Sequence, residues 1–208
     1  MKKEILAGIN TIIFDLGEVI IDLHPEKVIQ YLSRMWKIDA NQIKSLIVDN
    51  SQLIDYETGR IDELQMLDSI QRDFQTQITV DEFEYGWNLM IGDISQKRKN
   101  LLEILRKDYQ VLFLSNTNAM HERAFDTLAR EKFSISSLSV LVDRAYYSHN
   151  MGLRKPDKEI YKALIDDQNL NPRECLFLDD RMDNILSASE LGIKTLQITT
   201  PNQILGLI

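Results

Sequence analysis

The pattern of hydrophobic residues changes character along the chain. Residues 11–21 form an apolar, β-branched run interrupted by Asp15, Gly17 and Glu18. Such a run is typical of a strand buried on both faces, as in a parallel sheet. Ligands bind at the C-terminal edge of open parallel sheets, so Asp15 is a candidate for chemistry. Taken alone, it is equally well explained as a turn or helix-capping residue.

From residue 22 to residue 92 the pattern predicts helices and no strand. Apolar residues recur at helical spacing over residues 25–36, 41–49 and 62–74. A fourth helix is predicted to begin at Thr79, because Glu82 three residues later completes a capping box. We therefore expect a compact helical unit here.

After residue 92, predicted strands alternate with predicted helices. The strands fall at 111–114, 144–148, 175–178 and 194–198, and the helices at 96–107, 118–131, 157–168 and 183–191. This alternation predicts parallel βαβ units. The expected fold is α/β, a Rossmann-like doubly wound parallel sheet. Residues 1–21 and 93–208 would form this core, and residues 22–92 an inserted helical cap.

Composition and charge narrow the classes of partner. The 208 residues are 44% hydrophobic and 27% charged, as in ordinary globular proteins. A net charge of −8 with no basic block gives no electrostatic support for a nucleic-acid partner. A single cysteine, Cys175, excludes an internal disulfide, and no apolar stretch is long enough for a signal peptide or membrane span. We expect a cytoplasmic protein with no membrane partner; the sequence carries no signal for an oligomeric state.

Two further polar signals follow predicted strands. Ser115 and Asn116 end the strand at 111–114, where a hydroxyl and backbone N–H groups at a helix start can hold an anion. A plain cap or turn role for Ser115 is the default alternative. Lys155 lies between a predicted strand and a helix, and can lean over the same edge, although most loop lysines are simply solvated.

The sharpest signal is the pair Asp179 and Asp180, directly after the strand at 175–178. Adjacent carboxylates repel, and near Asp15 they would raise one another's pKa unless a cation neutralised them. A hard divalent ion with oxygen ligands resolves this repulsion, and Mg²⁺ suits the small number of carboxylates.

Together these signals resemble the motifs of the haloacid dehalogenase superfamily of phosphohydrolases, over essentially the whole chain. The matching segments are Asp15-Leu16-Gly17-Glu18-Val19, Ser115-Asn116, Lys155 and Asp179-Asp180. The helical insertion resembles the type I cap. The residues within these motifs are most similar to those of the α-glucose-1-phosphate phosphatase group and of the phosphatase domain of soluble epoxide hydrolases.

The resemblance implies a phosphatase that acts on a small phosphorylated metabolite, with sugar phosphates first, through an aspartyl-phosphate on Asp15. It also implies a set of supporting roles. Mg²⁺ would be held by Asp15, the Gly17 carbonyl and Asp180 with Asp179 beside it, while Ser115, the Asn116 N–H and Lys155 would bind the phosphoryl group.

One departure concerns proton transfer. Most phosphatases of the superfamily carry a second Asp two residues after the nucleophile as general acid and base, but here Gly17 occupies that position. Losing such a group typically slows a reaction by roughly 10²- to 10⁴-fold. A sugar 1-phosphate lessens the need, because its hemiacetal leaving oxygen is more acidic than a simple alcohol. Glu18 and His24 are near enough in sequence to carry the proton, or are simply solvated turn residues.

The predicted helical cap offers candidates for substrate contact. These are Glu57, in the turn Tyr56-Glu57-Thr58-Gly59, and Trp87 with Asn88. For Trp87, a place in the core of the lid is an equal alternative. His121 and His149 match no metal or nucleophile motif, and we expect them at the surface or in loops.

Two other functions compete with phosphatase activity. A 2-haloacid dehalogenase would use the same aspartate on carbon without a metal, but the pair Asp179 and Asp180 would repel its carboxylate substrate. A non-catalytic binding module would instead explain Gly17 as the mark of a decayed site.

Overall fold

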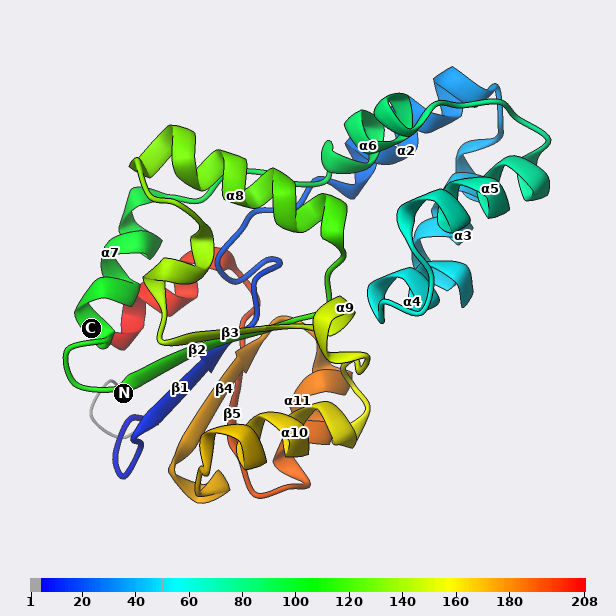
Figure 1. The fold of residues 1–208 in the computed structure, drawn as a ribbon. Coiled ribbons are helices and arrows are strands. Elements are labelled where there is room, and N and C mark those ends of the chain that lie inside the picture. Colours follow the sequence, from blue (N-terminus) through cyan, green and yellow to red (C-terminus); the bar gives the residue numbers. More distant parts are fainter. Residues whose placement is uncertain (1–4, 50) are drawn as a thin grey trace.

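The structure is a computed structural model that describes residues 5–49 and 51–208. Its centre is a five-stranded sheet in the order β3-β2-β1-β4-β5, with every neighbouring pair parallel (Figure 1). The strands are β1 (Thr11–Phe14), β2 (Gln110–Ser115), β3 (Arg144–Tyr147), β4 (Cys175–Asp179) and β5 (Lys194–Gln197). All five strands were predicted from the sequence, and β1, predicted to be buried on both faces, is the central strand and is buried along its whole length.

Helices cover both faces of the sheet (Figure 1). Ile12 and Phe14 of β1 pack in one hydrophobic cluster and Ile13 in another, because successive side chains point to opposite faces. The first cluster includes residues of α7 (Gln96–Leu105), α8 (Ala119–Phe133), η1 (Leu138–Leu141) and η3 (Pro201–Leu207). The second includes residues of α10 (Lys158–Gln168) and α11 (Met182–Ser189). The predicted doubly wound α/β core is confirmed.

Between β1 and α7, the described residues form helices only. They are α2 (Pro25–Trp36), α3 (Ala40–Asp49), α4 (Ser51–Glu57), α5 (Glu63–Phe74) and α6 (Val80–Asn88). The capping box at Thr79 and Glu82 is formed as predicted, whereas α4 was not predicted. These helices lie beside the sheet domain and bury a hydrophobic cluster, to which Met120 of α8 also contributes (Figure 1). The boundary of the helical unit at residues 22–92 stays a prediction.

Short elements complete the chain. They are α9 (Ser148–Met151), directly after β3, and η2 (Pro172–Glu174), directly before β4. α11 begins at Met182, one residue before the predicted start, and Gly192 follows it in the left-handed conformation that favours glycine. Across residues 5–49 and 51–208, each helix is too short or too polar to cross a bilayer.

Core packing gives a test of the fold. Phe113 of β2 is fully buried in the cluster that joins the sheet to α7 and α8. Phe113→Ala should lower the free energy of unfolding by about 3–5 kcal/mol, because it removes buried contacts and leaves a cavity. Urea titration followed by circular dichroism measures this, with Leu186→Ala on the exposed side of α11 as a control that changes stability by less than about 0.5 kcal/mol. Equal effects of the two substitutions would contradict the packing described.

Candidate active site

Asp15 directly follows β1, at the carboxyl edge of the sheet. Its backbone N–H donates to the Leu178 carbonyl at 2.9 Å, which fixes it beside the end of β4. The chain then turns sharply, because the Ile20 and Ile21 N–H groups both donate to the Leu16 carbonyl at 2.8 Å. The predicted strand run at 11–21 is therefore a four-residue strand followed by a buried turn.

Lys155 joins the two acidic motifs. Its Nζ lies 2.7 Å from Asp15 Oδ1 and 2.6 Å from Asp179 Oδ2, and the residue is 2% exposed. Burial alone would lower the pKa of Lys155, but the charges of Asp15 and Asp179 outweigh it and raise the pKa. The alternative that Lys155 is a solvated loop residue is therefore wrong, because its ammonium group is buried between two carboxylates.

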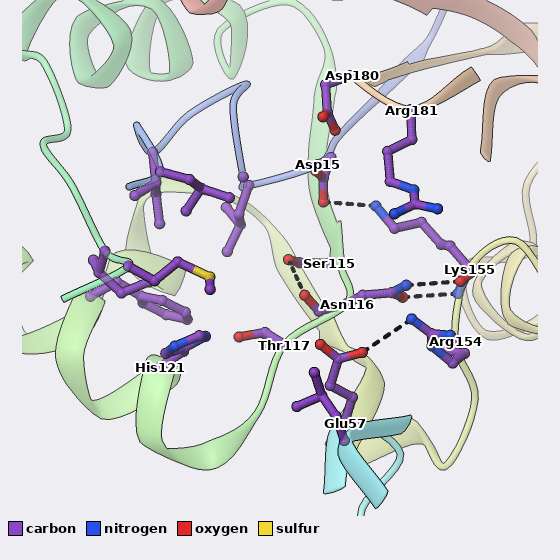
Figure 2. Close-up of a pocket in the computed structure, with 18 of the residues that line it drawn as sticks. Asp15, Glu57, Ser115, Asn116, Thr117, His121, Arg154, Lys155, Asp180 and Arg181 are labelled. Carbon is purple, nitrogen blue, oxygen red and sulfur yellow. Dashed lines mark hydrogen bonds and ion pairs between the residues drawn. The ribbon is translucent and has the colours of Figure 1, made fainter. Parts of the chain in front are cut away.

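The side chain of Asn116 holds the Lys155 backbone in place. Asn116 Oδ1 accepts from the Lys155 N–H at 2.9 Å, and Asn116 Nδ2 donates to the Lys155 carbonyl at 2.8 Å. This reciprocal pair ties the loop after α9 to the end of β2 (Figure 2). Ser115, the last residue of β2, is buried next to Asn116 and lines the cavity described below.

Three carboxylates converge at this edge. One oxygen each from Asp15, Asp179 and Asp180 lie within 4.8 Å of one another. Burial raises the pKa of Asp15 to about 7, with Lys155 opposing and Asp179 adding to the rise. Burial and the charge of Asp179 likewise raise the pKa of Asp180 to about 6. One lysine against three acids leaves an excess of negative charge, and the oxygen donors fit a hard divalent cation such as Mg²⁺.

Asp179 is the most constrained of the three acids. The Arg181 N–H donates to its Oδ1 at 2.8 Å, and Asn184 Nδ2 lies 3.0 Å from both of its oxygens. With Lys155 on Oδ2, the carboxylate is fixed from several directions. Asp180 projects from the same turn into the cavity (Figure 2).

A cavity of about 380 Å³ lies between this edge of the sheet and the helical unit. This volume is at the small end of the usual range for small-molecule sites, about 300–1,000 Å³. Its sheet side carries Asp15, Ser115, Lys155 and Asp180, and its helical side carries Glu57, Trp87 and several apolar side chains. Gly17 also lines it, and a Cβ there would lie 2.8 Å from Leu23 Cδ1.

Glu18 serves the turn rather than the cavity. Its Oε1 accepts from the Leu23 N–H at 2.8 Å, and its backbone has a φ of +54°. Nδ1 of His24 lies 3.3 Å from Glu26. Neither Glu18 nor His24 is among the described residues that line the cavity, so the structure does not bring these two candidate proton carriers to Asp15.

Glu57 reaches the cavity from the end of α4. Gly59, at φ +65°, allows a close approach, because a Cβ there would lie 2.3 Å from the His149 carbonyl oxygen. The approach places Glu57 Oε2 3.1 Å from Arg154 Nη2. Burial raises the pKa of Glu57, while the charge of Arg154 opposes the rise. An ion pair thus joins the helical unit to the sheet domain inside the cavity.

Trp87 combines the two roles considered for it. It stacks on Phe83 and His121 at centroid distances of 5.5 and 5.4 Å, and it also lines the cavity. Asn88 is half-buried and is not among the described lining residues.

The expectation that His121 lies at the surface or in a loop is wrong. His121 is buried in α8 and lines the cavity. Its Nε2 lies 3.2 Å from the Trp87 carbonyl and its Nδ1 lies 3.3 Å from Asn118 Nδ2. Burial lowers the pKa of His121 to about 4, so the ring is neutral, with Nε2 donating and Nδ1 accepting. His149 is half-buried in the short helix α9 and pairs with Glu122 at 2.8 Å.

Sequence reasoning missed several cavity residues, namely Thr117, His121, Arg154, Arg181 and Asn184. Most of them adjoin a recognised motif, and that adjacency was the available signal. His121 lies four residues before Phe125 on α8, so both face the same side of the helix. Arg154 directly precedes Lys155, but its partner Glu57 is 97 residues away in the sequence.

Comparison with known proteins identifies the family. Residues 9–192 match the haloacid dehalogenase-like hydrolases. The chain belongs to this family. The resemblance noted in the sequence and the expectation of an enzyme are confirmed.

Three similar proteins cover nearly the whole chain. The D-ribitol-5-phosphate phosphatase of Bacteroides thetaiotaomicron is 28% identical over 191 residues, which cover 91% of each chain. A family enzyme from the same organism, solved with magnesium and inorganic phosphate, is 28% identical with a TM-score of 0.83 over 91% of this chain and 93% of that one. A predicted family hydrolase from Porphyromonas gingivalis is also 28% identical with a TM-score of 0.83, over 91% of this chain and 90% of that one.

The acidic cluster gives a test that does not depend on activity. Adding MgCl₂ should raise the melting temperature by several degrees, because a ligand at 100 times its Kd stabilises the folded state by about 2.7 kcal/mol. Asp180→Asn should lose most of this rise, as measured by differential scanning fluorimetry against KCl of equal ionic strength. Asp183→Asn is the matched control, because Asp183 pairs with Arg181 outside the cluster. An equal rise in Asp180→Asn and the parent would contradict a metal site here.

Proposed function

We propose that this hydrolase is a magnesium-dependent phosphatase acting on a small phosphomonoester, namely a sugar or polyol phosphate. The observation that carries the proposal is the carboxylate of Asp15 held 2.7 Å from the buried Lys155 ammonium group, at the edge of a cavity and beside two further acids. The similarity to a relative named as a D-ribitol-5-phosphate phosphatase supports the substrate class.

Asp15 is the nucleophile in this proposal. A carboxylate oxygen forms a bond to phosphorus while the bond from phosphorus to the alcohol oxygen breaks, which leaves an aspartyl-phosphate and a free alcohol. Water then attacks the phosphorus, releases inorganic phosphate and restores Asp15. Lys155 favours the ionised form of Asp15 and offers a positive charge to the phosphoryl oxygens. The Ser115 hydroxyl and the Asn116 backbone N–H bind the same oxygens.

The acidic cluster would hold the metal through Asp15, Asp180 and the Gly17 carbonyl, with Asp179 beside it. When bound, magnesium supplies the positive charge that lets a phosphate dianion approach a carboxylate. The helical unit acts as a cap in this proposal, because its side chains close the cavity over Asp15 and exclude bulk water.

The leaving group bears on the absent acid at position 17. A sugar 1-phosphate, such as a hexose 1-phosphate, releases a hemiacetal oxygen that needs less protonation than a simple alcohol. D-ribitol 5-phosphate, named for the relative, is an ester of a primary alcohol, so polyol phosphates belong in the same class of candidates. In both cases the proton comes from water or the substrate in this proposal, since neither Glu18 nor His24 lines the cavity.

Phosphate release tests the proposal. A panel of phosphorylated metabolites and p-nitrophenyl phosphate should release inorganic phosphate with magnesium and not with EDTA. Asp15→Asn should lower the rate by at least about 10³-fold, because the amide is a poor nucleophile. Asp183→Asn serves as the control outside the cluster and should keep most of the activity.

The alternatives predict different outcomes of the same assay. Halide release from chloroacetate in EDTA would favour a dehalogenase. A folded protein that hydrolyses none of these esters would favour a binding module.

A second test concerns Glu18. Glu18→Gln should hydrolyse a sugar 1-phosphate within about twofold of the parental rate, because the carboxylate oxygen serves the Leu23 N–H and an amide oxygen can replace it there. Steady-state kinetics from pH 5 to pH 9 measures this. Loss of one limb of the pH–rate profile in Glu18→Gln would instead identify Glu18 as the proton carrier.

A further inference from the structure

Every basic side chain among the described residues that line the cavity already has a carboxylate partner. Lys155 lies between Asp15 and Asp179, and Arg181 pairs with Asp183 at 2.7 Å. Arg154 pairs with Glu57 at 3.1 Å. His121 adds no charge, because burial keeps its ring neutral. Each lysine and arginine among these lining residues is therefore already paired with an acid, and the Arg181–Asp183 pair is the most exposed, with side chains 64% and 44% exposed.

The Glu57–Arg154 pair occupies the end of the cavity away from the nucleophile. Figure 2 shows Asp15 and Asp180 on one side of Ser115 and Asn116, and Glu57 with Arg154 on the other. A substrate whose phosphate lies against Asp15 can therefore extend its remaining atoms toward this pair. The two side chains are only 18% and 27% exposed, so breaking the pair would leave a charge poorly solvated.

We propose that the Glu57–Arg154 pair selects substrates whose non-phosphate part is an uncharged polyhydroxyl chain or ring, and rejects those with a second anionic group. The inference rests on the proposed phosphatase function and names the chemistry of its substrate. A hydroxyl can donate to the Glu57 carboxylate or accept from the Arg154 guanidinium while the pair stays intact. A carboxylate or second phosphate would compete for Arg154 and meet the charge of Glu57.

The pair has two ends with opposite effects on an incoming anion. Without the carboxylate of Glu57, Arg154 would be a free cation in the cavity and would attract a second anionic group. Without Arg154, this end of the cavity has no cation to attract the anionic group, and any ionised Glu57 repels it. A merely structural role for the pair would not separate these two effects.

Matched substrates test the proposal. Sorbitol 6-phosphate and 6-phosphogluconate differ only at C1, where one has a hydroxymethyl group and the other a carboxylate; glycerol 3-phosphate and 3-phosphoglycerate form a shorter pair. The parent with magnesium should favour the uncharged member of the longer pair by about 10- to 100-fold in kcat/KM. Glu57→Gln should narrow this ratio at least tenfold, mainly through a lower KM for 6-phosphogluconate. Arg154→Gln should widen it.

Glu63→Gln is the matched control. Glu63 also joins the helical unit to the sheet domain, through Arg123 at 2.8 Å, but neither residue lines this cavity. The ratio of kcat/KM values for sorbitol 6-phosphate and 6-phosphogluconate in Glu63→Gln should equal that of the parent. If Glu57→Gln does not fold, as judged by thermal melting, the widened ratio of Arg154→Gln decides alone.

Two failures remain distinct. If the parent releases no phosphate from these esters or from p-nitrophenyl phosphate, the proposed function fails and the inference with it. If the parent is active but has no preference, or if Glu57→Gln and Arg154→Gln move the ratio in the same direction, the inference is overturned and the phosphatase stands.

Discussion

The ammonium group of Lys155 is the point on which the catalytic edge of the sheet depends. It is buried between Asp15 and Asp179, and its backbone is held by the side chain of Asn116. With Asp180 close by, three carboxylates share one lysine, so the cluster carries an excess of two negative charges when all are ionised. An incoming phosphate dianion adds two more. The edge therefore needs further positive charge to bind substrate, and a divalent ion brings it without a further side chain.

The sheet and most helices follow from patterns within short segments. β1, β2 and β4 are largely apolar runs, and the order of predicted strands and helices predicts parallel connections, so the core could be predicted without long-range information. The helix α4 could not. Its seven residues, with only Leu53 and Tyr56 buried, are too short to establish a helical period, and packing against α5 and α9 stabilises them instead.

The cluster of Asp15, Ser115 and Asp179 at the sheet edge was predictable for a related reason. Asp15, Ser115 and Asp179 each end or directly follow a strand, and parallel strands bring their carboxyl ends to one edge. Local patterns could not place Glu18 or His121. Glu18 adjoins the nucleophile in sequence, but the Leu23 N–H binds its carboxylate. His121 looks polar in sequence, but Trp87 from another helix covers it.

The two ends of the cavity are thus specified in different ways. The positions of Asp15 and Lys155 depend on the backbone of the sheet domain. Substitutions in the helical unit therefore leave these two side chains in place. The proposed selective end depends on Glu57 meeting Arg154 across 97 residues, and on Gly59 leaving room for the His149 carbonyl. A change of charge or size in the turn after α4 can therefore alter which substrate fits without touching the reacting groups. In the proposed function, this separation lets one phosphoryl-transfer edge serve different substrates through changes in the helical unit.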